Sequence, residues 1–415
     1  MSPIRVGCAL LLMLAAGCAS GQPVSGQPVS GRPAARTPLI FVLIDGFRAD
    51  YLDRGITPAL SALAAGGVRS IGMRPSTPSV SAPNHYTLVT GLYPDHHGMV
   101  DNTFIDRELG AYAGPEAYAN PAFWEGGTPI WVTAERQGVR SASVLYAGAD
   151  VPIHGVRAGR FVPRSESLRN DERVDRLLSW LDLAEAERPQ LMLLYFASVD
   201  GAGHLNGPTA PATDAAIAEL DTAIGRLVSG LRDRELLDRV NIVAAADHGM
   251  MSISTTDRVI QLSDLVDPDA VEETTYGATL GVNPLPGREA EVESAFLRSH
   301  DHLSCWRKSE IPARLHYGTH PRVPTIFCLA DPGWTTVTPA ALARYRVPLS
   351  GNHGFDPAHP EMAGLFIAHG PAFRVGLTLP AFENVHVYPL LARVLSIVPE
   401  PGDGSIDTLA PALRP

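Results

Sequence analysis

Four apolar segments of the chain predict the strands of a buried sheet. They are residues 39–44, 191–196, 240–246 and 364–368. Short apolar runs rich in aliphatic and aromatic residues are typical of strands that are covered on both faces. Residues 171–186 and 212–234 instead repeat their apolar positions with a helical period. Strands and helices that alternate in this way predict an α/β fold with a mostly parallel sheet and helices on both faces.

Acidic residues and histidines follow three of these segments closely. They are Asp45, then Asp200 and His204, then Asp247 and His248. His369 follows the fourth segment. Ligands of open α/β sheets bind outside the carboxyl ends of the strands, so polar residues at these ends are candidates for one shared site. Each of them taken alone is also compatible with a turn or a helix cap.

A further histidine, His353, lies in the glycine-flanked loop 351–355. Without His369, the candidates form a set of three Asp and three His in four segments, namely Asp45, Asp200, His204, Asp247, His248 and His353. Such a set can supply two metal sites of three protein ligands each, with a position left open for substrate or water. Two metal ions about 4 Å apart can clamp a phosphoryl group. The sequence therefore indicates phosphoryl chemistry at a pair of metal ions.

Ser81 is a candidate nucleophile. It opens a predicted helix whose first turn contains Pro83, and the N–H groups of such a turn favour an anion. A serine hydroxyl needs a metal or a base before it attacks at neutral pH. A role for Ser81 as a helix N-cap, and the nearby hydroxyls of Ser76, Thr77 and Ser79, are the alternatives.

The ordered motifs resemble the nucleotide pyrophosphatase/phosphodiesterase family of the alkaline phosphatase superfamily, over roughly residues 39–375. They are Leu-Ile-Asp-Gly-Phe-Arg at 43–48, Ser-Ala-Pro-Asn-His-Tyr at 81–86, Thr-Gly-Leu-Tyr-Pro at 90–94, His-Gly-Met at 97–99, Asp-Asn at 101–102, Asp200 with His204, Asp-His-Gly-Met at 247–250 and His-Gly-Phe-Asp at 353–356. The resemblance implies an alkaline-phosphatase-like, doubly wound sheet.

The resemblance also implies two zinc ions and a hydrolysis of phosphodiester or pyrophosphate bonds through a phospho-serine intermediate on Ser81. Asn102 would donate a hydrogen bond to a phosphate oxygen. The implied ligands are Asp200, His204 and His353 for one zinc ion, and Asp45, Asp247, His248 and the Ser81 oxygen for the other. The implied partner is a small phosphodiester or nucleotide.

Two positions depart from the family pattern, which usually has Thr at position 81 and often has an aromatic residue at position 82. Ser81 keeps the hydroxyl, but Ala82 removes a stacking surface worth about 1–3 kcal/mol per base. Tyr146 lies near another substrate-facing aromatic position of the family. We expect it in the substrate pocket, with a place in the core as the alternative.

Other classes of function fit the residues less well. A phosphomonoesterase is the nearest alternative, although residues 146–154 carry no Lys or Arg for a more highly charged monoester. A sulfatase would have Arg where His85 stands. A Ser-His-Asp hydrolase lacks its Gly-x-Ser-x-Gly turn. A non-catalytic zinc protein of the cell envelope would saturate its metal with ligands, often Cys.

The N-terminus predicts export. Arg5 precedes the apolar run 6–16, and the small residues before Cys18 resemble a bacterial lipoprotein signal. We expect a signal peptide over 1–17, a lipid on Cys18 as the only membrane contact and a periplasmic or envelope location. Cleavage near Ala19 without a lipid is the alternative. The Gly-Gln-Pro-Val-Ser repeats predict a flexible linker over 18–36, before a catalytic domain over 37–415.

The charge of the chain limits the kinds of partner that it can bind. The 415 residues include 33 Lys and Arg against 44 Asp and Glu, a net charge of −11, without a basic run, so we expect no nucleic-acid polymer as partner. Positive charge for an anionic substrate must then be local, and a bound metal can supply it.

Cys305 and Cys328 predict a disulfide, with two buried thiols as the alternative. They lie in 266–334, which we expect to form a smaller α+β insertion.

Overall fold

The computed structural model describes residues 36–338 and 349–415. The predicted signal peptide, Cys18 and the linker up to residue 35 lie outside the described residues. Within the described ranges, none of the helices has the length and hydrophobicity that a bilayer span requires.

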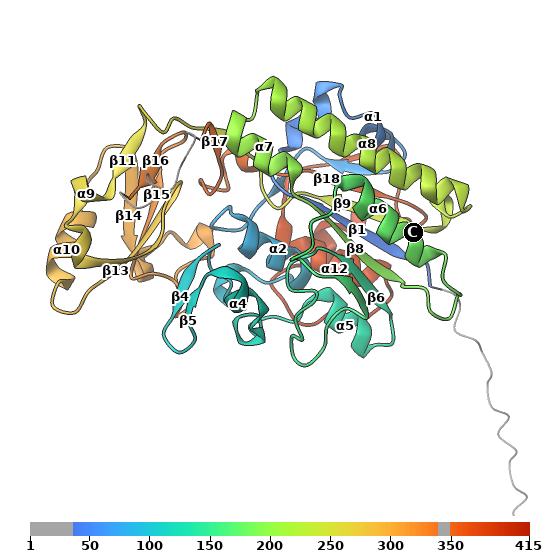
Figure 1. Ribbon diagram of the computed structural model, residues 1–415, viewed down its shortest axis with the longest axis horizontal. Helices are drawn as coiled ribbons and strands as arrows, with labels where there is room; N and C mark the ends of the chain where they lie inside the picture. The colour runs from blue at the N-terminus through green and yellow to red at the C-terminus, as the bar shows by residue number, and fades with distance from the viewer. Residues whose placement is uncertain (1–35, 339–348) are drawn as a thin grey trace, which may run out of the picture. The chain divides into compact units, whose positions relative to one another are not determined.

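An eight-stranded sheet forms the centre of the fold (Figure 1), in the order β19-β2-β18-β9-β1-β8-β6-β7. β1 lies between β8 and β9 and runs parallel to both. The strand bounds are β1 Leu39–Ile44, β2 Val68–Ser70, β6 Ser141–Val144, β7 Arg160–Val162, β8 Leu191–Phe196, β9 Asn241–Ala245, β18 Phe366–His369 and β19 Leu377–Leu379. The predicted α/β fold with a mostly parallel sheet is confirmed.

The register of the three central strands brings their carboxyl ends together. Ile44 at the end of β1 pairs with Phe196 at the end of β8. Leu43 pairs with Ala245 at the end of β9. The residues that follow each strand therefore emerge at the same edge of the sheet, which is the edge where open α/β sheets bind ligands.

The fourth predicted strand runs the other way, which corrects the expectation that His369 shares this edge. β18 pairs antiparallel with β9, and His369 lies opposite Ile242 near the start of β9. Its side chain therefore belongs to the opposite edge of the sheet.

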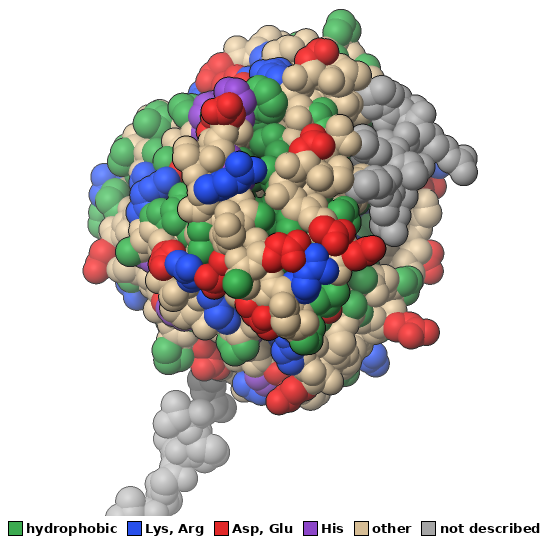
Figure 2. Space-filling model, turned by 90° about the vertical axis from the view of Figure 1, so that its left-hand side faces the viewer, with side chains coloured by type: hydrophobic (Ala, Val, Ile, Leu, Met, Phe, Trp, Pro, Cys, Tyr) green, Lys and Arg blue, Asp and Glu red, His purple; other side chains and the backbone are tan. Residues whose placement is uncertain are grey.

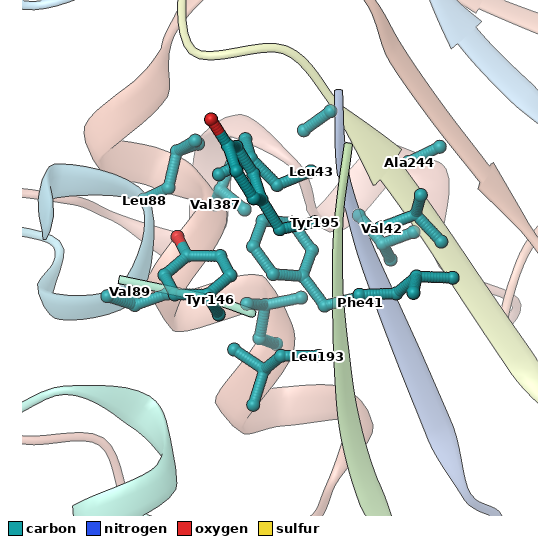
Figure 3. Close-up of a cluster of buried hydrophobic side chains, with 14 of the residues drawn as sticks. Phe41, Val42, Leu43, Leu88, Val89, Tyr146, Leu193, Tyr195, Ala244 and Val387 are labelled. Carbon is teal, nitrogen blue, oxygen red and sulfur yellow. The ribbon is translucent and has the colours of Figure 1, made fainter. Parts of the chain in front are cut away.

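Helices cover both faces of the sheet, as the sequence predicts (Figure 1). The helices on one face are α1 (Pro58–Ala65), α6 (Asn170–Leu181), α7 (Ser198–Asn206) and α8 (Pro211–Asp233). The helices on the other face are α2 (Ser81–Thr90), α5 (Ile130–Arg136) and α12 (Val387–Val394). Figure 3 shows Leu88 and Val89 of α2 packed with Phe41 of β1 and Val387 of α12, all fully buried. Burial of these apolar side chains fixes α2 against the sheet.

A smaller lobe has its own core and a four-stranded antiparallel sheet, in the order β12-β13-β15-β14. Its strands are β12 Val271–Thr275, β13 Thr279–Pro284, β14 Leu303–Arg307 and β15 Ile326–Ala330, with helices α9 (Leu262–Leu265) and α10 (Glu289–Phe296). Cys305 and Cys328 form a disulfide between β14 and β15. On the face shown in Figure 2, acidic and basic side chains are interspersed.

The smaller lobe extends past the expected range 266–334 on both sides. β11 (Val259–Gln261) precedes that range and pairs with β16 (Thr335–Val337), which follows it. A hairpin of the larger part, β4 (Phe104–Asp106) with β5 (Gly110–Tyr112), contacts β12. Two further two-stranded sheets pair β3 (Met73–Arg74) with β20 (Phe382–Glu383) and β10 (Met251–Ser252) with β17 (Gly351–Asn352). Two short helices, α3 (Pro94–His97) and α4 (Gly114–Ala119), complete this part of the chain.

Candidate active site

The six Asp and His residues predicted as metal ligands lie close together at the carboxyl edge of β1, β8 and β9. Asp45 directly follows β1, and Asp247 and His248 follow β9. Asp200 and His204 both lie on α7, where a spacing of four residues places them on one side of the helix. His353 directly follows β17.

Asp200, His204 and His353 form one group. The Nε2 atom of His204 lies 3.4 Å from Asp200 Oδ1 and 3.1 Å from the Nε2 atom of His353. His353 Nε2 lies 3.6 Å from the same Asp200 oxygen. One ion placed between these three atoms would be within reach of all of them.

Asp45, Asp247 and His248 form a second group. The Nε2 atom of His248 lies 3.4 Å from Asp45 Oδ1 and 3.2 Å from Asp247 Oδ2. The ring of His248 also stacks on that of His353, with 3.6 Å between ring centroids. His248 offers a ligand atom within 4.8 Å of those of Asp200 and His353, so the two groups adjoin.

Backbone carbonyls orient all three imidazole rings. The Nδ1 atoms of the three histidines lie 2.9–3.0 Å from carbonyl oxygens, those of Gly351 for His204, Gly249 for His248 and Ser79 for His353. A carbonyl only accepts, so each Nδ1 donates to its carbonyl, and Nε2 is the ring nitrogen that faces the site. Second partners of this kind are typical of metal-binding histidines.

The buried carboxylates of the site favour a bound cation. Burial raises the pKa of Asp200 well above its usual range, and the charges of Asp45 and Asp247 raise it further. Burial also lowers the pKa of His353 and His204, which favours neutral rings with free lone pairs. Asp200 Oδ1 is buried without a hydrogen-bond partner in the described protein. This unpaired oxygen and the neutral imidazoles of His353 and His204 fit divalent metal ions such as zinc.

Ser81 is the first residue of α2, and its hydroxyl lies at the second group. Its Oγ atom is 3.2 Å from His248 Nε2 and 3.4 Å from Asp45 Oδ1. The N-cap of α2 is Val80, so the alternative role of Ser81 as an N-cap is not what the structure has. Two of the alternative hydroxyls are engaged elsewhere, Ser76 with Asn384 and Ser79 with the Phe355 carbonyl.

The side chain of Asn102 lies beside the start of α2. Its Oδ1 atom accepts a hydrogen bond of 2.7 Å from the backbone N–H of Ala82. Since a backbone N–H only donates, this contact fixes which end of the amide is oxygen. The Nδ2 group of Asn102 is therefore the end that can donate to another acceptor.

Two residues that support the candidate ligands were not recognised as such from the sequence. His85 lies one turn after Ser81, with its Nε2 atom 2.9 Å from Asp247 Oδ2 and 3.4 Å from Asp45 Oδ2. Burial opposes its charged form, but Asp247 and Asp45 raise the pKa of His85 to about 9. Tyr195, within the apolar strand β8, donates a hydrogen bond of 2.6 Å to Asp45 Oδ2.

Tyr146, expected in the substrate pocket, lies in the core (Figure 3). It is 1% exposed, its hydroxyl donates to the carbonyl oxygen of His85, and its ring packs near Phe41 and Trp131. These contacts place both the ring and the hydroxyl of Tyr146 in the core, which favours the core alternative. Tyr146 is therefore not included in the proposed site.

Carboxylates and imidazoles collected beside a serine hydroxyl, at the carboxyl edge of an α/β sheet, define a metal-dependent hydrolase of phosphate bonds. Residues 39–356 match the type I phosphodiesterase / nucleotide pyrophosphatase family. An uncharacterised pyrophosphatase/phosphodiesterase of Schizosaccharomyces pombe is 37% identical in an alignment that covers 91% of this chain and 81% of that protein. This chain therefore belongs to the type I phosphodiesterase / nucleotide pyrophosphatase family and is a hydrolase of that type.

Animal proteins show the same relationship. Human ectonucleotide pyrophosphatase/phosphodiesterase family member 7 is 33% identical over 98% of this chain and 88% of its own length. Rat family member 3 is 34% identical, but the match covers only 44% of that protein. The structure of murine ectonucleotide pyrophosphatase/phosphodiesterase 5, an inactive variant in complex with AMP, has a TM-score of 0.86 at 33% identity and covers 91% of this chain and all of that one.

Asp101, next to Asn102, is a buried carboxyl group outside the two groups of candidate ligands. Its Oδ1 atom accepts a hydrogen bond of 2.7 Å from the Asn102 backbone N–H. Burial nevertheless raises the pKa of Asp101 to about 7. A carboxyl group whose pKa is higher in the folded than in the unfolded protein favours folding at low pH, and that contribution is lost as pH rises through the folded-state pKa.

We expect Asp101→Asn to stabilise the protein relative to the parent as pH rises. The amide has no charge to bury, whereas the parent loses stability between about pH 4 and about pH 7 as Asp101 ionises. Thermal unfolding of both proteins at about pH 5 and about pH 8 measures the effect, because all other titrating groups are shared. A difference in melting temperature that is the same at both pH values would contradict the assigned pKa.

Proposed function

We propose that this chain hydrolyses phosphodiester or pyrophosphate bonds in small molecules by a two-step mechanism in which Ser81 is the nucleophile. The observation that supports it most is the position of the Ser81 hydroxyl. It lies at the N-terminus of α2 and within 3.4 Å of both His248 and Asp45. A hydroxyl in that position can share a metal ion with both side chains, which would lower its pKa.

The proposed site holds two zinc ions. Asp200, His204 and His353 would bind one ion, and Asp45, Asp247 and His248 would bind the other together with the Ser81 oxygen. When bound, the ions would supply positive charge for the attacking and leaving oxygens. The Nδ1 contacts of the three histidines and the contacts of His85 and Tyr195 with the carboxylates hold these ligands in place.

The chain's own residues then account for both steps. The Ser81 hydroxyl gives its proton to solvent water, and its oxygen forms a bond to phosphorus as the bond between phosphorus and the leaving oxygen breaks; the leaving oxygen takes up a proton from water. A water molecule next forms a bond to phosphorus as the Ser81–phosphorus bond breaks, one of its protons returns to the Ser81 oxygen, and a phosphate monoester leaves. Asn102 Nδ2 and the backbone N–H of Ser81, at the start of α2, would donate to the non-bridging oxygens in both steps.

A diester fits the proposed site better than a monoester. A monoester carries more negative charge, and relatives that cleave monoesters place cationic side chains on the phosphate. Among the described residues, the hydrogen bonds and ion pairs of Ser81, Asn102 and the six candidate ligands involve neither Lys nor Arg. The AMP complex of the murine relative further supports a nucleotide among the substrates. Phosphomonoester hydrolysis is the second candidate activity.

Ser81→Ala tests the nucleophile. We expect kcat on a p-nitrophenyl phosphodiester to fall by at least about 1000-fold, because among the described residues Ser81 alone places a hydroxyl beside both His248 and Asp45. Release of p-nitrophenol by the variant and the parent measures it, and melting temperature controls for folding. A bis-ester, a monoester and a nucleotide ester assayed side by side rank the substrate classes. Equal hydrolysis by variant and parent would show that the assignment of Ser81 is wrong.

Metal removal tests the two groups of ligands. We expect a chelator to abolish turnover and zinc to restore it, with about two ions per chain in the restored protein. Metal content by mass spectrometry gives a readout independent of activity. Asp200→Asn and Asp247→Asn should each lose about one ion, because one ligand of three is weakened. Full turnover in metal-free protein would refute the proposed site.

Export and anchorage form a separate part of the proposal. The signal over 1–17 would direct the chain out of the cytoplasm, and a lipid on Cys18 would hold the catalytic domain at the envelope through the linker. Small residues before a cysteine that follows an apolar run of signal-peptide length support this.

Cys18→Ala tests the anchor. We expect the parent, expressed in a bacterium that processes lipoproteins, to fractionate with membranes and to incorporate labelled fatty acid. The variant should do neither and should keep its specific activity, since Cys18 lies outside the catalytic domain. Labelling of the variant at the level of the parent would exclude Cys18 as the lipidated residue.

A further inference from the structure

The loop that carries Asn102 is attached to the smaller lobe. The hydroxyl of Thr103 donates a hydrogen bond of 3.0 Å to the carbonyl oxygen of Thr274 on β12. The hydroxyl of Tyr317 donates one of 3.0 Å to the carbonyl oxygen of Val100. The two contacts lie on either side of Asn102, so the lobe restrains the backbone before and after it.

The ends of this segment are fixed to the same region by charged groups. Asp95 accepts hydrogen bonds from three successive backbone N–H groups, those of Gly318, Thr319 and His320. Arg322 pairs with Asp106 at 2.6 Å. Hydrogen bonds in which one partner is charged are about twice as strong as neutral ones. The segment from 95 to 106 is therefore held at both ends as well as in its middle.

Asp101 joins the two parts of the molecule at Asn102 itself. It is 6% exposed, and its Oδ1 atom accepts from the backbone N–H of Asn102. The side chain of Thr275 on β12 is near enough to lower the pKa of the same carboxyl group. On its other side, Asn102 accepts from the backbone N–H of Ala82, next to Ser81. The hydrogen bond of Thr103 to β12 and those of Asp101 and Asn102 therefore connect the smaller lobe to the first turn of α2.

We propose that Asp101 is a positioning residue, which fixes Asn102 beside Ser81 and thereby makes the smaller lobe a determinant of transition-state stabilisation. This inference rests on the proposed roles of Ser81 and Asn102. Donors aimed at developing charge stabilise it most when they are already in place. A displacement of about 1 Å at such a group can cost about 100-fold in rate. The effect of Asp101 should therefore fall on kcat rather than on KM.

Asp101→Ala and Asp101→Asn separate positioning from burial of charge. The alanine variant removes the acceptor for the Asn102 N–H, so we expect kcat on a p-nitrophenyl phosphodiester to fall by about 10- to 100-fold, with KM within about 3-fold. The asparagine variant keeps an acceptor oxygen and should stay within about 3-fold of the parent. Arg107→Ala is the matched control, because it removes an exposed contact of the adjoining hairpin with Glu272 of β12 and should leave kcat unchanged.

A double-mutant cycle with Asn102→Ala shows whether Asp101 acts through Asn102. If it does, Asp101→Ala should lower kcat in the parent but change it by less than about 2-fold when Asn102 is already alanine. Thr103→Val, which removes only the bond to Thr274, should behave in the same way with a smaller effect and covers the case that Asp101→Ala fails to fold. Additive losses in both cycles would overturn the inference.

The same set of variants distinguishes this inference from the proposed function. If Ser81→Ala and Asn102→Ala keep the activity of the parent, the proposed function itself is wrong. If both lose activity while Asp101→Ala and Thr103→Val, folded as judged by melting temperature, keep it, only the positioning role is wrong. Unchanged zinc content in the Asp101 variants is expected in either case, because no candidate ligand contacts Asp101 in the described protein.

Discussion

Three carboxylates crowded into one buried space are the constraint on which the site depends. Asp45, Asp200 and Asp247 follow neighbouring parallel strands, or begin the helix after one, so the register of the sheet forces them together. Burial and mutual repulsion make three negative charges unfavourable there, as the raised pKa of Asp200 reflects. His85 offsets part of this charge. Divalent cations would relieve the rest, and imidazoles whose Nδ1 atoms donate to backbone carbonyls would complete the proposed ligand set. Apolar strands thus hold acidic groups in an arrangement that favours bound cations.

Most of this arrangement could be predicted because it follows from two simple patterns. Apolar runs of six or so residues mark strands buried on both faces, and β1 and β8 match residues 39–44 and 191–196 as expected. Parallel strands then place their carboxyl ends together, whatever their separation in sequence. This is why side chains from Asp45 to His353, about 300 positions apart, could be grouped before the structure was known. Their binding of zinc stays a prediction.

The errors and omissions arise where sequence pattern carries no directional information. An apolar run predicts a strand but not the direction in which it runs, so His369 was placed at the wrong edge. An aromatic residue near the site has the same pattern in the core as in a pocket, and the packing around Tyr146 decides between them. Tyr195 reads as one more apolar strand residue. Its hydrogen bond to Asp45 depends on which face of β8 meets α2, which the sequence of β8 alone does not fix.

The two parts of the molecule make different contributions to one site. The candidate metal ligands come from the carboxyl edge of the central sheet and from the helix and loop beside it, whereas Asn102, the proposed neutral donor, lies next to residues held by the smaller lobe. A second junction lies on the other side of Ser81, where Gly354 adopts a positive φ of 100° and a Cβ atom added to it would lie 3.2 Å from Val80 and 3.3 Å from Ala278. A side chain at Gly354 would be strained and would press on both neighbours. Because both junctions meet the residues that flank Ser81, the proposed positioning role implies that changes in the smaller lobe would alter transition-state stabilisation without altering the charge balance of the candidate metal ligands.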